Sequence, residues 1–403
     1  MNNIVIIEEA ILEINELNTN HHGNMIRDII AVIKNRFNAF CFIAKKKETD
    51  YKKIWNFLIK FIKKLSILLR MENNFWKGKK VLVTGGSGFI GSYVAELLIQ
   101  KGAIVSITTF KGRKSNDEER NIKDFKNKIT ILNADLMDMQ KCLEVTKGKD
   151  IVLNLAARVG GIELNSKHPS IMFKDNLLMF MNVIEASRIN NVEKFLTVSS
   201  ACVYPHICTI PIPEEEGFKD APAPSNEGYG WAKRMQEFLS KSYAKEYGMK
   251  IAIVRPSNAY GPRDNFDAET SHVIPALIRR ILNGENPLIV WGSGNQTRSF
   301  LYATDFARGL LEIAEKHAVS DPINLGDERE VTIKELVTIL LKLCNKEKDI
   351  KVIYDTSKPE GQPRRCSDVN KAKKLLQYKT EVKLEDGLKQ TIEWYKQEVQ
   401  KRK

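Results

Sequence analysis

Tyr229 and Lys233 are the first residues whose types and spacing could do chemistry. They stand four positions apart in the run Tyr-Gly-Trp-Ala-Lys. In a helix this spacing places a phenol and an ammonium group on one face, one turn apart. Such a pair can donate a proton to the oxygen of an alcohol or ketone, or remove one from it. Ser200 follows an apolar run at 194–199, and its hydroxyl could hydrogen-bond the same oxygen.

A glycine-rich run supplies the second chemical signal. The sequence VLVTGGSGFIG places Gly85, Gly88 and Gly91 after an apolar strand, with Phe89 and Ile90 between the last two glycines. Glycine allows the backbone to turn tightly and to approach a pyrophosphate, whose negative charge is stabilised at a helix N-terminus. The run predicts a dinucleotide site, and the Tyr-Lys pair further along the chain indicates a nicotinamide dinucleotide.

Cys202 adds a group that a simple alcohol dehydrogenase does not need. A thiol beside a ketone could remove a proton from the adjacent carbon, because the ketone delocalises the resulting charge as an enolate. His272 lies in a polar segment after the strand expected at 251–255, and its imidazole could supply the partner acid near neutral pH. Buried cysteines are more often inert packing residues, so this hypothesis depends on both residues reaching one site.

These residues need a scaffold, and from Lys79 onward the pattern alternates strands with helices. The alternation is typical of an α/β fold with a doubly wound parallel Rossmann sheet. Beyond Pro256 it loosens, which predicts a smaller C-terminal α/β substrate-binding domain. We expect an N-terminal extension at 1–70, a cofactor-binding domain at 71–255 with a returning segment near 300–326, and a substrate-binding domain at 256–403. The expected strands span 80–84, 104–108, 129–133, 151–155, 194–199, 251–255 and 322–326, and two of the expected helices span 92–101 and 171–190.

Charge and cysteine content restrict the partners. The 403-residue chain has a formal net charge of +13, but its lysines are scattered and accompany no nucleic-acid-binding motif. We therefore expect an anionic nucleotide substrate and no nucleic-acid partner. The six cysteines show no metal-ligand spacing, so we expect no metal. Reduced thiols and the lack of a signal-peptide pattern indicate a cytoplasmic protein.

Residues 51–70 alternate lysines with bulky apolar residues, so a helix there would be basic on one face and apolar on the other. Such a helix could lie on an anionic membrane surface. We favour two other interpretations: the helix packs on the enzyme body or a partner, or translation starts at Met71. The segment lacks the roughly 20 uncharged apolar residues needed to cross a bilayer.

Together these motifs resemble the extended short-chain dehydrogenase/reductase family, whose glycine spacing is the G-x-x-G-x-x-G found here. The runs YGPRDNF, SHVIPALIRR, VWGSGNQTRSFL and AARVGGIELN further resemble the GDP-L-fucose synthases, in register from roughly Met71 to the C-terminus. That resemblance implies 3,5-epimerisation and then NADPH-dependent 4-reduction of GDP-4-keto-6-deoxy-D-mannose. It also implies a homodimer, by analogy with the helix expected at 171–190.

The same resemblance implies roles for individual residues. Cys202 and His272 would be the base and acid of epimerisation, while Ser200, Tyr229 and Lys233 would form the reductive triad. Further residues are assigned to the cofactor: Leu136, Ala156, Lys233, Pro256 and Asn258. Others are assigned to the GDP-sugar: Val159, Gly160, Asn258, Arg280, Trp291 and Arg298.

The end of the second expected strand bears on the choice of cofactor. It reads Thr108-Thr109-Phe110, and Lys111 and Arg113 follow where an NAD-binding sheet usually carries an acidic residue. A ribose 2′-phosphate would attract these cations, so we predict NADP, with NAD as the alternative. Asp135, after the third strand, lies where this family contacts the adenine.

Two alternatives remain open. Ala201 departs from the fucose-synthase pattern, and SSACVYP at 199–205 and QTRSF at 296–300 are similar to GDP-mannose 3,5-epimerase, which uses NAD without net turnover. His272 and the missing acid after the second strand oppose that alternative, and KPEGQPRR at 358–365 fits either family. A nucleotide-sensing regulator that lost the chemistry is the alternative of another class, although Ser200, Tyr229 and Lys233 are all retained.

Overall fold

The computed structural model describes residues 75–110, 117–358 and 361–398. The basic segment at 51–70, together with Lys111 and Arg113, lies outside these ranges. The expectations about membrane contact and about a ribose phosphate held by these cations therefore stay predictions. Within the described ranges, no helix is both long enough and apolar enough to cross a bilayer.

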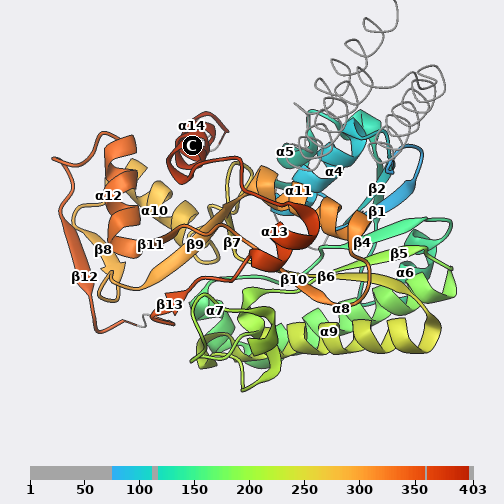
Figure 1. Ribbon diagram of the computed structural model, residues 1–403. Helices are drawn as coiled ribbons and strands as arrows, with labels where there is room; N and C mark the ends of the chain where they lie inside the picture. Colours follow the sequence, from blue (N-terminus) through green and yellow to red (C-terminus); the bar gives the residue numbers. More distant parts are fainter. Residues whose placement is uncertain (1–74, 111–116, 359–360, 399–403) are drawn as a thin grey trace, which may run out of the picture. The chain divides into compact units, whose positions relative to one another are not determined.

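The central sheet consists of parallel strands from most of the described chain (Figure 1). Its members are β1 (Lys80–Thr84), β2 (Ile104–Thr109), β3 (Thr130–Asn133), β4 (Ile151–Asn154), β5 (Lys194–Val198), β6 (Lys250–Pro256) and β10 (Pro322–Leu325). They lie in the order β10-β6-β5-β4-β1-β2-β3, and every neighbouring pair is parallel. Strands β1, β4 and β6 are buried along almost their full length, as is typical of parallel sheets covered on both faces.

Helices cover both faces of this sheet (Figure 1). They include α4 (Phe89–Gln100), α6 (Met139–Thr146), α8 (Pro169–Ile189), α9 (Glu227–Tyr247) and α11 (Ala303–Lys316). Helices α8 and α9 pack together against one face, and α4 packs with α11 on the other. Under α8, Phe180 and Ile184 share an apolar core with Val152 of β4 and Phe195 of β5. The doubly wound α/β fold predicted from the sequence is confirmed.

The strand order reverses at the centre of the sheet. From β1 the chain adds β2 and β3 on one side, and it then crosses to add β4, β5, β6 and β10 on the other. The connections that follow β1 and β4 therefore diverge, which opens a crevice at the carboxyl ends of the strands. Strand β10 joins β6 in parallel, with Ile323 opposite Val254.

A second group of elements follows β6. Its strands are β7 (Asn258–Tyr260), β8 (Leu288–Trp291), β9 (Thr297–Tyr302), β11 (Glu330–Thr332), β12 (Val352–Asp355) and β13 (Arg364–Arg365), and its helices include α10 (Val273–Leu282), α12 (Ile333–Leu343) and α14 (Leu384–Glu398). Strand β9 pairs with β7, β11 and β13, and β8 pairs with β12. Ile278 of α10, Leu336 of α12 and Leu388 of α14 share one buried core. A domain boundary at 255/256 stays a prediction.

Candidate active site

The glycine run forms a tight turn between β1 and α4. Gly85 has a left-handed backbone, with φ of 64°, and its N–H donates to Thr108 Oγ1 at 3.0 Å. The N–H of Gly88 donates to the carbonyl of Gly85 at 3.0 Å. A Cβ at Gly91 would lie 2.2 Å from that same carbonyl oxygen, so no larger residue fits without moving the backbone.

The N-terminus of α4 faces the crevice without a neutralising group. Gly88 precedes the helix in an extended conformation, and within the described ranges no side chain caps it and no acidic residue lies in its first turn. The first N–H groups and the helix dipole are therefore available to a phosphate. Nearby, Asp135 keeps its carboxylate exposed and accepts a hydrogen bond from the Met137 N–H at 2.9 Å. This arrangement suits a dinucleotide.

The end of β2 lacks the acidic residue that an NAD-binding sheet usually carries there. Thr108, Thr109 and Phe110 line the crevice, and none of these three residues is acidic. Phe110 is 46% exposed. None of these side chains offers a carboxylate to a ribose hydroxyl or a positive charge to a 2′-phosphate. Charge selection between NAD and NADP therefore depends on the segment that begins at Lys111.

Ser200 and Tyr229 meet just beyond β5. Ser200 begins a short 3-10 turn, and its Oγ accepts a hydrogen bond from the N–H of Cys202 at 3.1 Å. Tyr229 projects from the first turn of α9 and hydrogen-bonds Ser200. Burial raises the pKa of the phenol well above its usual range, while the bond to Ser200 and the charge of Arg365 act in the opposite direction.

Lys233 lies one turn after Tyr229 and is buried. Its Nζ donates to the Val198 carbonyl at 2.7 Å and to Gln236 Oε1 at 3.1 Å, and lies 5.5 Å from the centre of the Tyr229 ring. Burial lowers the pKa of Lys233 to about 8. The sequence predicts that its charge lowers the pKa of Tyr229. In the structure desolvation is the largest influence on the phenol, and it raises the phenol's pKa.

Cys202 and His272 line the same cavity, although they come from segments far apart in the sequence. Cys202 is a free, half-buried thiol, and Arg365 Nη2 donates to its Sγ at 3.1 Å. His272 directly precedes α10 in an extended conformation. Its side chain lines the cavity, and desolvation lowers the pKa of the imidazole. The neutral form is therefore favoured.

The arginines expected at the substrate are already engaged by the protein. Arg280 contacts both carboxylate oxygens of Glu285, at 2.8 Å and 2.5 Å, and also the Ile289 carbonyl at 2.6 Å. Arg298 donates to the Gln362 carbonyl at 2.7 Å. Trp291 is 43% exposed at the edge of the cavity. Arg280 could bind a diphosphate only by giving up or sharing its pairing with Glu285.

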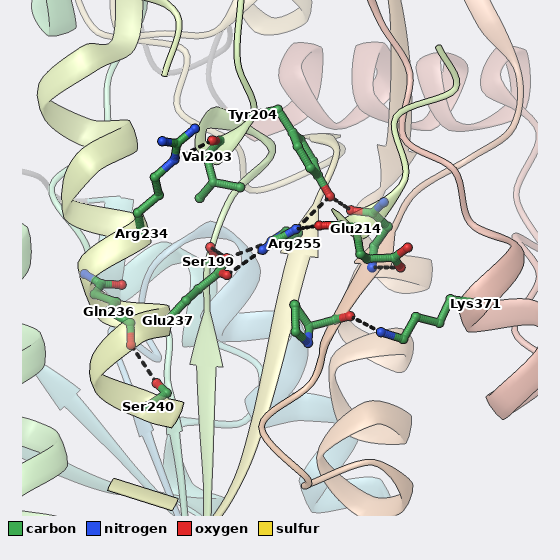
Figure 2. A network of polar contacts seen from close by, with 12 residues as sticks. Ser199, Val203, Tyr204, Glu214, Arg234, Gln236, Glu237, Ser240, Arg255 and Lys371 are labelled. Atoms are coloured by element: carbon green, nitrogen blue, oxygen red, sulfur yellow. Dashed lines mark hydrogen bonds and ion pairs between the residues drawn. The ribbon is translucent and has the colours of Figure 1, made fainter. Parts of the chain in front are cut away.

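A buried polar network lies behind these groups (Figure 2). Glu237 of α9 accepts hydrogen bonds from Arg255 Nε and Nη2 of β6, at 2.8 Å and 2.7 Å, and from Ser199 at the end of β5. Arg255 also donates to the Tyr204 hydroxyl at 3.2 Å. Both partners of this ion pair are almost fully buried. The network therefore fixes α9, which carries Tyr229, against the strand end that carries Ser200.

One cavity of about 1330 Å³ connects the glycine turn with Ser200, Tyr229, Lys233, Cys202 and His272. It is lined by every candidate residue that the structure describes: Gly85, Gly88, Phe89, Ile90, Gly91, Asp135, Leu136, Ala156, Val159, Gly160, Ser200, Cys202, Tyr229, Lys233, Pro256, Asn258, His272, Arg280, Trp291 and Arg298. Arg113 lies outside the described residues. Arg365 also lines the cavity, although the sequence assigned it no role. The signal was the run KPEGQPRR, whose last residue is Arg365.

Comparisons with known proteins agree with this geometry. Residues 81–326 match the NAD dependent epimerase/dehydratase family. The chain is 33% identical to a GDP-mannose 3,5-epimerase of Oryza sativa subsp. japonica, over 82% of this chain and 86% of that protein. It is equally 33% identical to a GDP-L-fucose synthase of Escherichia coli (strain K12), over 79% of this chain and 96% of that protein.

Solved structures give the same result. The epimerase Mth375 of Methanothermobacter thermautotrophicus superimposes with a TM-score of 0.73 at 27% identity, over 82% of this chain and 95% of that one. A UDP-glucuronic acid 4-epimerase of Bacillus cereus, solved with UDP-glucuronic acid and NAD, gives a TM-score of 0.69 at 28% identity, over 79% and 99%. The chain belongs to the NAD-dependent epimerase/dehydratase family of enzymes.

Proposed function

We propose that the protein is an epimerase and reductase of the GDP-L-fucose synthase type, acting on GDP-4-keto-6-deoxy-D-mannose. The observation that carries this proposal is the position of the Cys202 thiol in the same cavity as Ser200, Tyr229 and Lys233. A reductase alone needs only the last three, whereas a thiol beside them can act on the carbons next to a ketone. Similarity to named GDP-L-fucose synthases at 32–33% identity supports the GDP-sugar substrate.

Epimerisation begins at the ketone. Ser200 and Tyr229 hydrogen-bond the C4 carbonyl oxygen and stabilise the negative charge that develops on it. Cys202 takes the proton from C3 or C5, and the C–H electron pair passes into the enolate. His272 must carry a proton for this step, although desolvation lowers its pKa. It returns that proton to the opposite face of the carbon, which inverts it.

Reduction uses the same oxygen contacts. The glycine turn would hold a nicotinamide dinucleotide, which when bound would supply the hydride for C4. Tyr229 donates its proton to the oxygen as the alcohol forms. Lys233 holds the cofactor ribose, and its charge favours the tyrosinate that remains.

We further propose NADPH as the reductant and a homodimer as the working form. The absence of an acid among Thr108, Thr109 and Phe110 and the cations that follow them support NADPH. Met181 of α8 and Phe238 of α9 are 44% and 60% exposed on two helices that pack together. Such apolar exposure supports pairing of this face with a second copy.

GDP-mannose 3,5-epimerase is the second candidate. Ala201 and the run QTRSF at 296–300 favour it, as does the 33% identity to the rice enzyme of that name. In that reaction C4 would be oxidised, the neighbouring carbons inverted, and C4 reduced again on one bound NAD. The imidazole of His272 and the lack of an acid at the end of β2 weigh against it.

One incubation separates these candidates. Purified protein is supplied with GDP-4-keto-6-deoxymannose and NADPH or NADH in heavy water, and nicotinamide absorbance and deuterium at C3 and C5 are followed. We expect deuterium at both carbons with faster oxidation of NADPH than of NADH. Deuterium uptake without loss of reduced nicotinamide would favour the internal-redox epimerase. Cofactor binding with no exchange from any GDP-sugar would favour a regulator.

Cys202→Ser tests the step that distinguishes the proposal. We expect deuterium uptake to fall by about 10²- to 10⁴-fold, the usual contribution of a positioned acid or base, while cofactor binding is kept. Cys208→Ser is the matched control, since Cys208 is another half-buried free cysteine of the same chain segment. Wild-type exchange in Cys202→Ser would remove Cys202 from the mechanism.

A further inference from the structure

Arg365 reaches the catalytic thiol from a distant part of the chain. Its Nη2 donates to Cys202 Sγ at 3.1 Å, across 163 positions of sequence. Arg365 lies on β13, which pairs in parallel with β9 so that Arg365 stands opposite Arg298. The contact is therefore built by strand pairing and does not depend on a long loop.

No carboxylate neutralises Arg365 within the described ranges. Within those ranges its Nε is buried without a hydrogen-bond partner, and its Nη2 donates to the sulfur. Its neighbour differs: Arg364 pairs with Glu330 at 2.6 Å and is 56% exposed. Arg364 therefore forms an ion pair at the surface, whereas the adjacent Arg365 contacts the thiol of Cys202.

Several ionisable groups lie around Cys202. Lys233 and Tyr229 face the thiol from α9, Arg365 faces it from β13, and His272 lines the same cavity from the start of α10. A negative charge on Cys202 raises the pKa of both Lys233 and Tyr229, so the thiol and these two groups interact electrostatically. Arg365 and Lys233 are the cations of this arrangement.

We propose that Arg365 is a further catalytic residue, which stabilises Cys202 as the thiolate that removes the carbon proton. This role rests on the proposed function. When the thiolate takes a proton from C3 or C5, the S–H bond forms, the C–H bond breaks and the electron pair enters the enolate. The guanidinium is suited to this role because it stays charged at every accessible pH and its planar fork is held by β13. Arg365 thereby contacts the reacting thiol from β13, the strand that pairs with β9 and places Arg365 opposite Arg298.

The test measures thiolate formation directly, without substrate. The full-length protein is treated with iodoacetamide over a range of pH, and alkylation of the Cys202 peptide is followed by mass spectrometry. The midpoint of the rate profile reports ionisation of the thiol, and the plateau at high pH reports its accessibility. We expect Arg365→Gln to move the midpoint to higher pH and to lower the rate at neutral pH by at least about tenfold, as expected when an adjacent opposite charge is lost.

Two further variants make the result specific. Arg364→Gln removes a charge from the adjacent position and should leave the profile at the wild-type midpoint. Arg365→Lys keeps a positive charge, so its midpoint should lie between those of the wild type and Arg365→Gln. Thermal unfolding of Arg365→Lys shows whether the fold is intact. A midpoint in Arg365→Gln equal to that of the wild type overturns the proposal.

Substrate measurements separate this proposal from the function on which it rests. If Arg365→Gln shifts the midpoint and also lowers the maximal rate of deuterium uptake at C3 and C5, both stand. A shifted midpoint in a protein that exchanges no carbon proton from the GDP-sugar keeps the thiolate contact but refutes the catalytic role and the proposed function together. A raised KM with an unshifted midpoint would make Arg365 a substrate ligand and refute only the proposal for Arg365.

Discussion

At the active site, burial affects Tyr229 and Lys233 in opposite directions. It raises the pKa of the phenol and lowers that of the ammonium group to about 8, because desolvation favours the neutral form of each. The four-residue spacing predicts that the two groups meet. It does not predict their desolvation, because the surroundings come from distant segments such as Val198, whose carbonyl accepts from Lys233 Nζ.

This pKa leads to a prediction for Lys233. If its positive charge assists Tyr229, kcat/KM for NADPH oxidation should fall as the pH rises through about 8, where the free enzyme loses that charge. Lys233→Arg should move this alkaline limb to higher pH, because a guanidinium does not deprotonate there. Initial rates at low substrate concentration provide the profile. An alkaline limb at the same pH in both proteins would mean that Lys233 does not cause it.

The sequence predicts site residues that belong to local patterns, but it does not predict contacts between distant segments. The glycine spacing, the Tyr-Lys pair and the serine after a buried strand are local patterns, and their side chains line one cavity. The role of Arg280 in holding a nucleotide stays a prediction, and the structure adds that its guanidinium pairs with Glu285. Arg365 was not predicted at all, since its approach to Cys202 depends on the pairing of β13 with β9.

Among the elements, buried strands were the most predictable and helix starts the least. Strand β1 spans the predicted residues, because a continuous apolar run is typical of a strand covered on both faces. Helix α4 begins at Phe89, three residues before the predicted Ser92, because Gly88 takes the extended conformation that precedes a helix. The glycines that marked the turn therefore extend into the first turn of the helix.

The ion pair between α9 and β6 gives a prediction at this scale. Glu237→Gln would leave the Arg255 guanidinium buried without its full partner, which costs about 3–5 kcal/mol of unfolding free energy when such a pair is broken. Glu193→Gln is the control, because its 2.7 Å pair with Lys79 is partly exposed, with side-chain exposures of 41% and 32%. Pairs accessible to solvent contribute only about 0–1 kcal/mol. Urea denaturation of both variants measures the difference. Equal denaturation midpoints for the two would contradict the buried pair's structural role.

At the scale of the described chain, the site depends on C-terminal segments that pack against elements from earlier in the sequence. Strand β10 pairs with β6, and β13 reaches the thiol that follows β5. The sequence predicted the first return from an apolar run at 322–326. The second could not be predicted, because β13 is only two residues long, too short to show a periodic pattern.

Asp264 links this tertiary packing to the stability of the protein. Its carboxyl is buried in the segment between β7 and α10, with Oδ2 lacking a hydrogen-bond partner among the described residues. Burial raises its pKa from 3.8 to about 8. Between these two values the native state keeps a proton that the unfolded state releases, so Asp264 makes unfolding easier as the pH rises through that window.

Asp264→Asn should remove this pH dependence. We expect the variant to gain stability relative to the wild type as the pH rises from about 4 to about 8, by a few kcal/mol in total, with no further change outside that window.

Asp267→Asn should behave in the opposite way. Hydrogen bonds from the Glu269 and Thr270 N–H groups lower the pKa of Asp267 from 3.8. Its carboxylate therefore stabilises the protein fully above pH 3.8, and this stabilisation is lost as the pH falls through the lowered pKa. Denaturant midpoints for both variants across the pH range test this, and a pH-independent difference between Asp264→Asn and wild type would show that Asp264 is ionised in the folded protein.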